Sequence, residues 1–165
     1  MSLAANKPDL RRIGESAFAE VLGTMLSLSA TVGNSDGHTL LAGAADQITC
    51  SVLLTGPRLS GSVCVKLPRD FVTHAARLLT GVDGGAVDDA AVLEDAAGEL
   101  ANMVGGRIAA QLAECGYRCT LGTPTVADSA RRLIQNQPGV ECGRTELICE
   151  GHRLLLEIQC RYVVP

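Results

Sequence analysis

The stretch GSVCVKLPRDFVTHAARLLTG, residues 61–81, passes from the alternation of a strand to the spacing of a helix without a break. Before Pro68, apolar residues alternate with polar or small ones, as in a strand that buries one face. After Pro68 they recur at helical spacing as far as Gly81, a residue type that commonly ends helices. The stretch therefore predicts a strand that leads directly into a helix.

The segment upstream of this strand alternates in the same way. It covers residues 45–55, and the turn sequence GPRLSG at 56–61 follows it at once. Two alternating segments joined by a turn that contains Gly and Pro are typical of an antiparallel hairpin. We expect a short strand at residues 30–32 to join this hairpin.

Two more helices are indicated by the spacing of apolar residues. DLRRIGESAFAEVLGTMLSL predicts a helix over residues 9–28. EDAAGELANMVGGRIAAQL, residues 94–112, is a strong helix former, and a short acidic loop with the sequence VDGGAVDD precedes it. Two helices in succession therefore follow the hairpin.

Three further strand candidates follow Gly116. They are YRCTLGTPTV (117–126), GVECGRTELICE (139–150) and HRLLLEIQCRYVV (152–164). The last alternates in a way that predicts one buried face and one wetter face. The order helix, strands, helix, helix, strands has no regular βαβ alternation. It predicts the α+β class, in two layers with helices packed on a largely antiparallel or mixed sheet.

Length and composition limit the possible functions. A chain of 165 residues with 47% apolar composition suits one cored domain, so we expect residues 1–165 to form a single domain, with residues 1–8 as a flexible tail. A net charge of -4 and only four aromatic residues argue against nucleic acid. No apolar run is long enough to span a membrane and no signal peptide is visible, so we expect a cytoplasmic protein without a membrane partner.

No metal site is expected from the sequence. His38, His74 and His152 lie far apart in the sequence, and the spacing from Cys115 to Cys119 does not match that of a zinc site. Seven cysteines, an odd number in a chain of this size, indicate reduced thiols, most of them small core residues. The turn sequences GNSDGH and GVDGG lack the ending of a P-loop.

The helix within residues 94–112 has an unusual polar face. Its apolar side contains Leu93, Ala97, Leu100, Val104 and Ile108. Asp95, Glu99, Asn102 and Gly106 cluster on the opposite side at about 100° per residue, and Gly106 leaves room for an approaching body. The residues alone leave two plainer interpretations open: a solvated helix surface, and glycines at 105 and 106 that let a neighbouring element pack closely.

A short internal similarity bears on this face. GESAF at 14–18 aligns with GELAN at 98–102, and each is expected to begin a helix that precedes a group of strands. If the similarity is genuine, one half of the chain carries Glu99 and Asn102, while the other carries Glu15 and Phe18. Only one half would then perform chemistry.

The pattern Asp95-x3-Glu99-x2-Asn102-x3-Gly106, followed by GYRCTLGTPTV, resembles the CheC/CheX/FliY family of chemotaxis phosphatases, and the CheX-like branch in particular. The resemblance is clearest over residues 90–126 and extends more weakly, in element order, over most of the chain. It implies a CheC-like fold and hydrolysis of the aspartyl phosphate on a CheY-like response regulator receiver domain.

The resemblance also implies roles for the four residues. Asn102 inserts into the receiver and orients the attacking water, because a carboxamide can both accept and donate a hydrogen bond. Glu99 pairs with a lysine beside the phosphoaspartate. Asp95 either binds the partner or only caps and solvates the helix, and Gly106 keeps the partner-binding face clear. No cofactor is expected on this chain, and Mg²⁺ is expected on the receiver.

Two other functions remain open. The chain could be a non-catalytic receiver-binding or regulatory module of the same fold; a structural motor-switch component is disfavoured because no linker or second domain is visible. We also expect a homodimer, as the resemblance implies pairing through the sheets, with the strand at 152–164 as the edge that meets a second copy.

Overall fold

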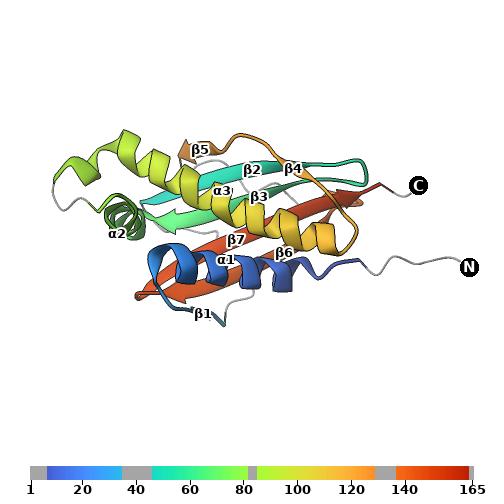
Figure 1. Cartoon of the computed structure of the whole chain (residues 1–165), viewed down its shortest axis with the longest axis horizontal. Helices are drawn as coiled ribbons and strands as arrows, with labels where there is room; N and C mark the ends of the chain where they lie inside the picture. Colours follow the sequence, from blue (N-terminus) through green and yellow to red (C-terminus); the bar gives the residue numbers. More distant parts are fainter. Residues whose placement is uncertain (1–6, 35–45, 82–84, 129–136, 164–165) are drawn as a thin grey trace, which may run out of the picture.

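The long helix α3 (Ala90–Glu114) crosses one face of an antiparallel sheet in the computed structural model of the chain (Figure 1). The structure describes residues 7–34, 46–81, 85–128 and 137–163. Within these ranges α1 (Leu10–Leu26) and α2 (Arg69–Thr80) complete the helical layer, with a 3₁₀ turn at Gly85–Asp88. The strands are β1 (Ala30–Val32), β2 (Gln47–Thr55), β3 (Leu59–Pro68), β4 (Thr120–Leu121), β5 (Thr125–Asp128), β6 (Glu141–Cys149) and β7 (His152–Tyr162).

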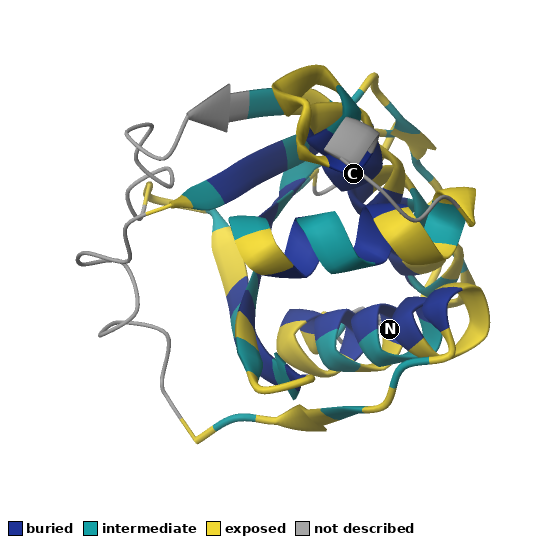
Figure 2. Cartoon of the chain, turned by 90° about the vertical axis from the view of Figure 1, so that its left-hand side faces the viewer, coloured by how far each residue is buried: buried dark blue, intermediate teal, exposed yellow. Residues whose placement is uncertain are grey.

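The sheet order confirms the α+β class. The strands lie in the order β1-β6-β7-β3-β2-β4, and β5 pairs with β2 beside β4. Each of these neighbouring pairs is antiparallel. In side view the helices pack on the sheet, and residues coloured as buried occur on both the helices and the strands (Figure 2). The buried apolar residues form one core cluster. Among the described residues, no helix is both long and apolar enough to cross a membrane.

The passage from strand to helix over residues 61–81 is confirmed. β2 and β3 form the expected hairpin, in which Val52 is opposite Val63. Helix α2 begins directly after Pro68 and is capped at its C-terminus by Gly81, which has φ +67° and donates its N–H to the carbonyl of Arg77 at 2.9 Å. A left-handed residue with this bond is a common helix terminus, and glycine adopts it without steric strain.

Two strand assignments from the sequence are wrong. Residues 117–126 do not form one strand, because the chain makes two short strands, β4 and β5, on either side of Gly122–Pro124. Proline has no N–H to donate to a sheet, which explains a break at this point. β1 does not join the β2–β3 hairpin either: it pairs with β6 at the far edge, with Val32 opposite Leu147.

The expected edge position of the last strand is also wrong. β7 lies between β6 and β3 and is paired on both sides, with Leu154 opposite Leu147 and Ile158 opposite Val63. It therefore has no free edge for a second copy. A central strand is bonded on both sides, and alternation within one strand carries no information about its neighbours.

The second face of β7 is not as wet as its alternation predicts. Glu157 and Gln159 are only 5% and 6% exposed. The Arg144 Nε donates to one Glu157 oxygen, and the Gln159 Nε2 donates to the other at 2.6 Å. These charge-assisted bonds satisfy the carboxylate away from water, so polar residues can be buried on this face.

The topology contains an internal repeat that agrees with the GESAF and GELAN similarity. α1 is followed by β1 and the hairpin β2–β3, and α3 is followed by β4, β5 and the hairpin β6–β7. The two hairpins meet at the antiparallel β3–β7 pair in the middle of the sheet. β1 pairs with the hairpin of the second half, and β5 pairs with the hairpin of the first. The halves are thus joined by exchanged edge strands.

Candidate functional site

Helix α3 presents its two faces as the apolar spacing predicts. Asp89 caps its start, where the side-chain carboxylate accepts a bond from the N–H of Ala91 at 3.0 Å. The apolar side is at most 2% exposed at the five predicted positions, Leu93, Ala97, Leu100, Val104 and Ile108. Packing of this side against the sheet and the neighbouring helices fixes the rotation of the helix, and so fixes the direction of the opposite face.

The exposed face of α3 carries three of the four predicted site residues in the open. Asp95, Glu99 and Asn102 are exposed, and Gly106 is half-buried. Glu99 and Asn102 are three residues apart, so their side chains are neighbours on the helix surface. Neither side chain bonds to any residue that the structure describes. Both are therefore free to bind a partner.

An open groove of about 570 Å³ runs beside this face. One wall is α3, and the other is the segment Pro124–Val126, which includes the start of β5. The described residues that line it are Glu94, Asp95, Gly98, Glu99, Asn102, Pro124, Thr125 and Val126. The structure thus brings the TPTV sequence, which in the sequence serves only as a marker of family resemblance, to the edge of the proposed catalytic pair.

The two consecutive glycines have different environments. A β-carbon at Gly105 would lie 3.3 Å from Leu121 Cδ2 and 3.7 Å from Val52 Cγ1, in the buried layer between α3 and the sheet. Gly105 therefore allows close packing of β4, which is the plainer of the two interpretations. A β-carbon at Gly106 would lie 3.9 Å from Leu121 Cδ1 on a partly exposed surface, an ordinary contact. Packing thus does not require glycine at 106.

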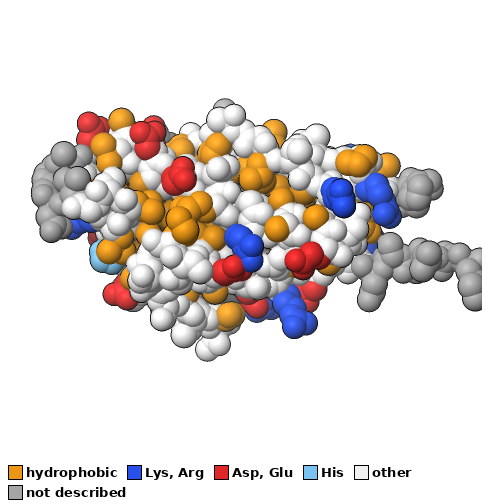
Figure 3. Space-filling view, viewed as in Figure 1, with side chains coloured by type: hydrophobic (Ala, Val, Ile, Leu, Met, Phe, Trp, Pro, Cys, Tyr) orange, Lys and Arg blue, Asp and Glu red, His pale blue; other side chains and the backbone are white. Residues whose placement is uncertain are grey.

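The charge beside the groove is negative. Figure 3 shows acidic side chains gathered over the first half of α3. Among the described residues that line the groove, the ionisable side chains are all carboxylates: Glu94, Asp95 and Glu99. Farther along the helix, Arg107 forms an ion pair with Glu20 of α1 at 2.6 Å. The cation on this helix is thereby partly neutralised.

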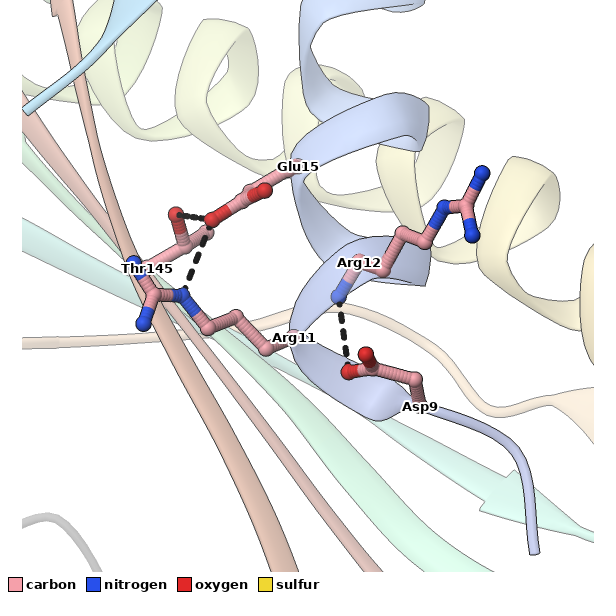
Figure 4. Close-up of polar contacts among 5 residues, drawn as sticks. All are labelled: Asp9, Arg11, Arg12, Glu15 and Thr145. Atoms are coloured by element: carbon pink, nitrogen blue, oxygen red, sulfur yellow. Dashed lines mark hydrogen bonds and ion pairs between the residues drawn. The ribbon is translucent and has the colours of Figure 1, made fainter.

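The equivalent position on α1 does not form a second site. The Glu15 carboxylate accepts bonds from Arg11 Nε at 3.0 Å and from Thr145 Oγ1 at 3.1 Å, so it is tied to its own helix and to β6 (Figure 4). Phe18, which aligns with Asn102, is completely buried. The first half of the chain therefore uses these positions for packing.

Other sequence candidates do not assemble into a site. Among the described residues, no three His, Cys, Asp or Glu side chains lie close enough together to hold a metal. His38 lies outside the described residues. All seven cysteines are free, of which Cys50, Cys149 and Cys160 are buried, whereas Cys115 and Cys142 are exposed. Burial raises the thiol pKa of Cys50 to about 11 and of Cys160 to about 12, which keeps both protonated and unreactive.

The two-layer architecture, with a long helix across an antiparallel sheet, is the fold of CheC-like proteins. CheX from Vibrio vulnificus has a TM-score of 0.76 at 19% identity, with 97% of this chain and 100% of that chain covered. CheX from Borrelia burgdorferi, solved as a CheX-CheY-BeF3-Mg²⁺ complex, has a TM-score of 0.69 at 17% identity, with 94% and 99% covered. FliY from Thermotoga maritima has a TM-score of 0.60 at 21% identity, with 95% and 91% covered.

A match between the sequence and a family model identifies the family within this fold. Residues 48–146, more than half of the chain, match the model of the family described as chemotaxis phosphatase CheX. No curated protein sequence matches the chain. The chain belongs to the CheX family of chemotaxis phosphatases.

Proposed function

We propose that this chain hydrolyses the aspartyl phosphate of a CheY-like receiver domain, with Asn102 orienting the attacking water and Glu99 pairing with a lysine beside the phosphoaspartate. The observation that carries the proposal is the pair itself. Both side chains are exposed and neighbouring, bond to no residue that the structure describes, and stand on a helix whose opposite side is buried in the core of a CheX-family chain.

The chemistry requires little more than such a pair. An aspartyl phosphate is a mixed anhydride that already tends to hydrolyse, so its hydrolysis needs a water held in line with the scissile bond. The Asn102 carboxamide can accept one hydrogen bond and donate another without adding charge beside the phosphoryl group. Positioning of this kind can lower a barrier by several kcal/mol. A rigid helix suits it, because the side chain must be held accurately.

The divalent metal in this proposal belongs to the receiver, and this chain supplies no cofactor. The solved relative from Borrelia burgdorferi is a complex with CheY, BeF3 and Mg²⁺, which supports a receiver partner that uses a metal. Phosphoryl charge must be neutralised during transfer, and a bound Mg²⁺ does so. A partner of this type implies a cytoplasmic location. Asp95 and Gly106 complete the partner-binding face, Asp95 as an acceptor and Gly106 as a clear surface.

The test is single-turnover decay of phosphorylated receiver domains from the same organism, with wild-type protein and with Asn102→Ala. The variant should lower the rate constant at saturation about 100-fold, equivalent to about 3 kcal/mol, because it removes an interaction made mainly in the transition state. Binding should change little. Full activity of Asn102→Ala would show that this residue does not orient the water.

The same experiment separates a phosphatase from a receiver-binding regulatory module. A module would bind a phosphorylated receiver but leave its decay rate unchanged. The groove at this face is open, so the water and the phosphoaspartate come together only when the receiver is bound. Receiver binding must therefore be measured in parallel with turnover.

A further inference from the structure

The rim of the groove carries more negative charge than the proposed reaction uses. Glu99 and Asp95 have proposed roles toward the receiver, but Glu94 also lines the groove, and Asp88 and Asp89 are exposed where α3 begins. Figure 3 shows that acidic side chains are concentrated in this region of the helical face. Among the described residues lining the groove, no lysine or arginine balances them.

Folding does not explain the carboxylates of Glu94 and Asp95. Neither bonds to a residue that the structure describes. The helix start is already capped by Asp89, whose carboxylate accepts from Ala91. Favourable interaction with the helix dipole falls off within the first turn, and Glu94 and Asp95 lie in the second turn of a helix that begins at Ala90. Their charges therefore project toward whatever enters the groove.

An acidic rim opposes the reaction unless the partner compensates for it. The substrate group is a phosphoryl anion, which is ordinarily bound by cations and N–H donors. Additional carboxylates near that anion repel it. Repulsion disappears if the rim instead contacts cationic side chains around the phosphorylation site. Complementary rim charges of this kind increase association rates and reject partners of the wrong sign.

Resting on the phosphatase function proposed above, we infer that Glu94 and Asp95 select receiver domains whose phosphorylation site is flanked by lysine or arginine side chains. Receivers with acidic flanks are rejected by repulsion, even when their phosphoaspartate chemistry is identical. The partner is thus defined by the charge of its rim as well as by its phosphoryl group.

The experiment compares Glu94→Lys with a matched control, Glu114→Lys. Glu114 lies exposed on the same helix, twenty residues farther on, and bonds to no residue that the structure describes. At a rise of about 1.5 Å per residue the two sites are roughly 30 Å apart, well beyond the Debye length of about 10 Å at 0.1 M salt. Both variants change the net charge equally, so any difference between them reports on the location of the charge.

Two readouts are needed: KM and kcat for a phosphorylated receiver, and Kd for the same receiver loaded with beryllofluoride, each at low and high salt. Glu94→Lys should raise KM and Kd about threefold to tenfold at low salt, and less at high salt. Glu114→Lys should match wild type. Reversal of a basic flanking residue on the receiver to Glu should weaken wild-type binding and partly restore the binding of Glu94→Lys.

The outcomes separate this inference from the function on which it rests. If wild type accelerates decay and Glu94→Lys behaves like Glu114→Lys, the rim does not select the partner, although the phosphatase assignment stands. If no receiver decays faster but beryllofluoride-loaded receivers bind, the phosphatase assignment fails and the Kd comparison still decides the role of the rim. If no receiver binds, both are overturned.

Discussion

At the scale of single residues, the two site residues differ in what they can offer to a partner. The Asn102 carboxamide is neutral and both donates and accepts, whereas the Glu99 carboxylate only accepts and carries a charge. Because both lie on an exposed face without bonds to described residues, their contribution to folding is small. Mutational effects at these positions should therefore report on binding and chemistry.

We predict that Glu99→Ala and Glu99→Gln weaken receiver binding, more strongly at low salt, because each removes the charge that pairs with the receiver's lysine. The free energy of unfolding should stay within about 0.5 kcal/mol of wild type, as is usual for surface changes. Titration of a beryllofluoride-loaded receiver at two salt concentrations measures the first effect, and urea unfolding measures the second. Wild-type affinity in Glu99→Gln would mean that the charge of Glu99 has no part in binding.

At the scale of elements, α3 packs on the sheet with one side and presents the proposed partner-binding residues on the other. Residues facing the sheet are closely packed, and at Gly105 even a β-carbon would lie only 3.3 Å from Leu121. The other face remains open along the groove. One helix can perform both tasks because its 3.6-residue period keeps the faces separate over its whole length. The consecutive glycines 105 and 106 lie at the boundary between these faces.

We predict that alanine separates the two glycines. Gly106→Ala should stabilise the protein by about 0.5–1 kcal/mol, because alanine is the better helix former and only ordinary contact with Leu121 results. Gly105→Ala should stabilise the protein less than Gly106→Ala, or destabilise it, since its methyl group would crowd Leu121. Urea unfolding of both variants measures this difference.

Receiver binding by the same two variants tests the role of Gly106. If Gly106 keeps the docking face clear, Gly106→Ala raises Kd for a beryllofluoride-loaded receiver even though the protein is more stable. Gly105→Ala, which is buried, should not change Kd. Unchanged binding by Gly106→Ala would remove Gly106 from the partner-binding face.

At the scale of the whole molecule, the two halves of the internal repeat use equivalent positions differently. The second half exposes Glu99 and Asn102, while the first half ties Glu15 to Thr145 and buries Phe18. An amide side chain is too small to fill the volume of a fully buried aromatic ring. The apolar surroundings of the ring would also leave the amide without hydrogen-bond partners. The first half therefore cannot become a second site through one substitution.

We predict that Phe18→Asn, which would copy the motif of the second half onto α1, destabilises the protein by more than about 3 kcal/mol and adds no phosphatase activity. The loss combines a cavity with a buried unsatisfied amide. Denaturant unfolding gives the stability, and turnover by Phe18→Asn in an Asn102→Ala background gives the activity. Restored turnover in the double variant would reveal a latent second site.

Homodimerisation remains a prediction, but its interface cannot be β7, which is paired on both sides. Among the described strands, the sheet ends at β1 on one side and at β4 and β5 on the other. A contact along β5 would obstruct the groove beside Pro124–Val126, so we expect β1, with its exposed Val32, to contribute the interface. Sedimentation at micromolar concentration should show a species of twice 17.1 kDa; a monomer alone contradicts the prediction.

Features that depend on neighbours along the chain were predictable from the amino-acid order. Residues 61–81 specified a strand and then a helix, because side-chain direction repeats every two residues in a strand and about every 3.6 in a helix. The same periodicity separated the buried side of α3 from Asp95, Glu99 and Asn102. The fold class and the exposed pair were therefore predictable.

Features that depend on contacts between distant segments were not predictable from the local pattern. The central place of β7, the exchange of β1 to β6, and the approach of Pro124–Val126 to α3 each join segments that local periodicity treats separately. The burial of Glu157 likewise depends on Arg144 from the neighbouring strand. Periodicity shows that one face of a segment is apolar, but the free energy that selects its neighbour comes from packing and hydrogen bonds across the folded molecule.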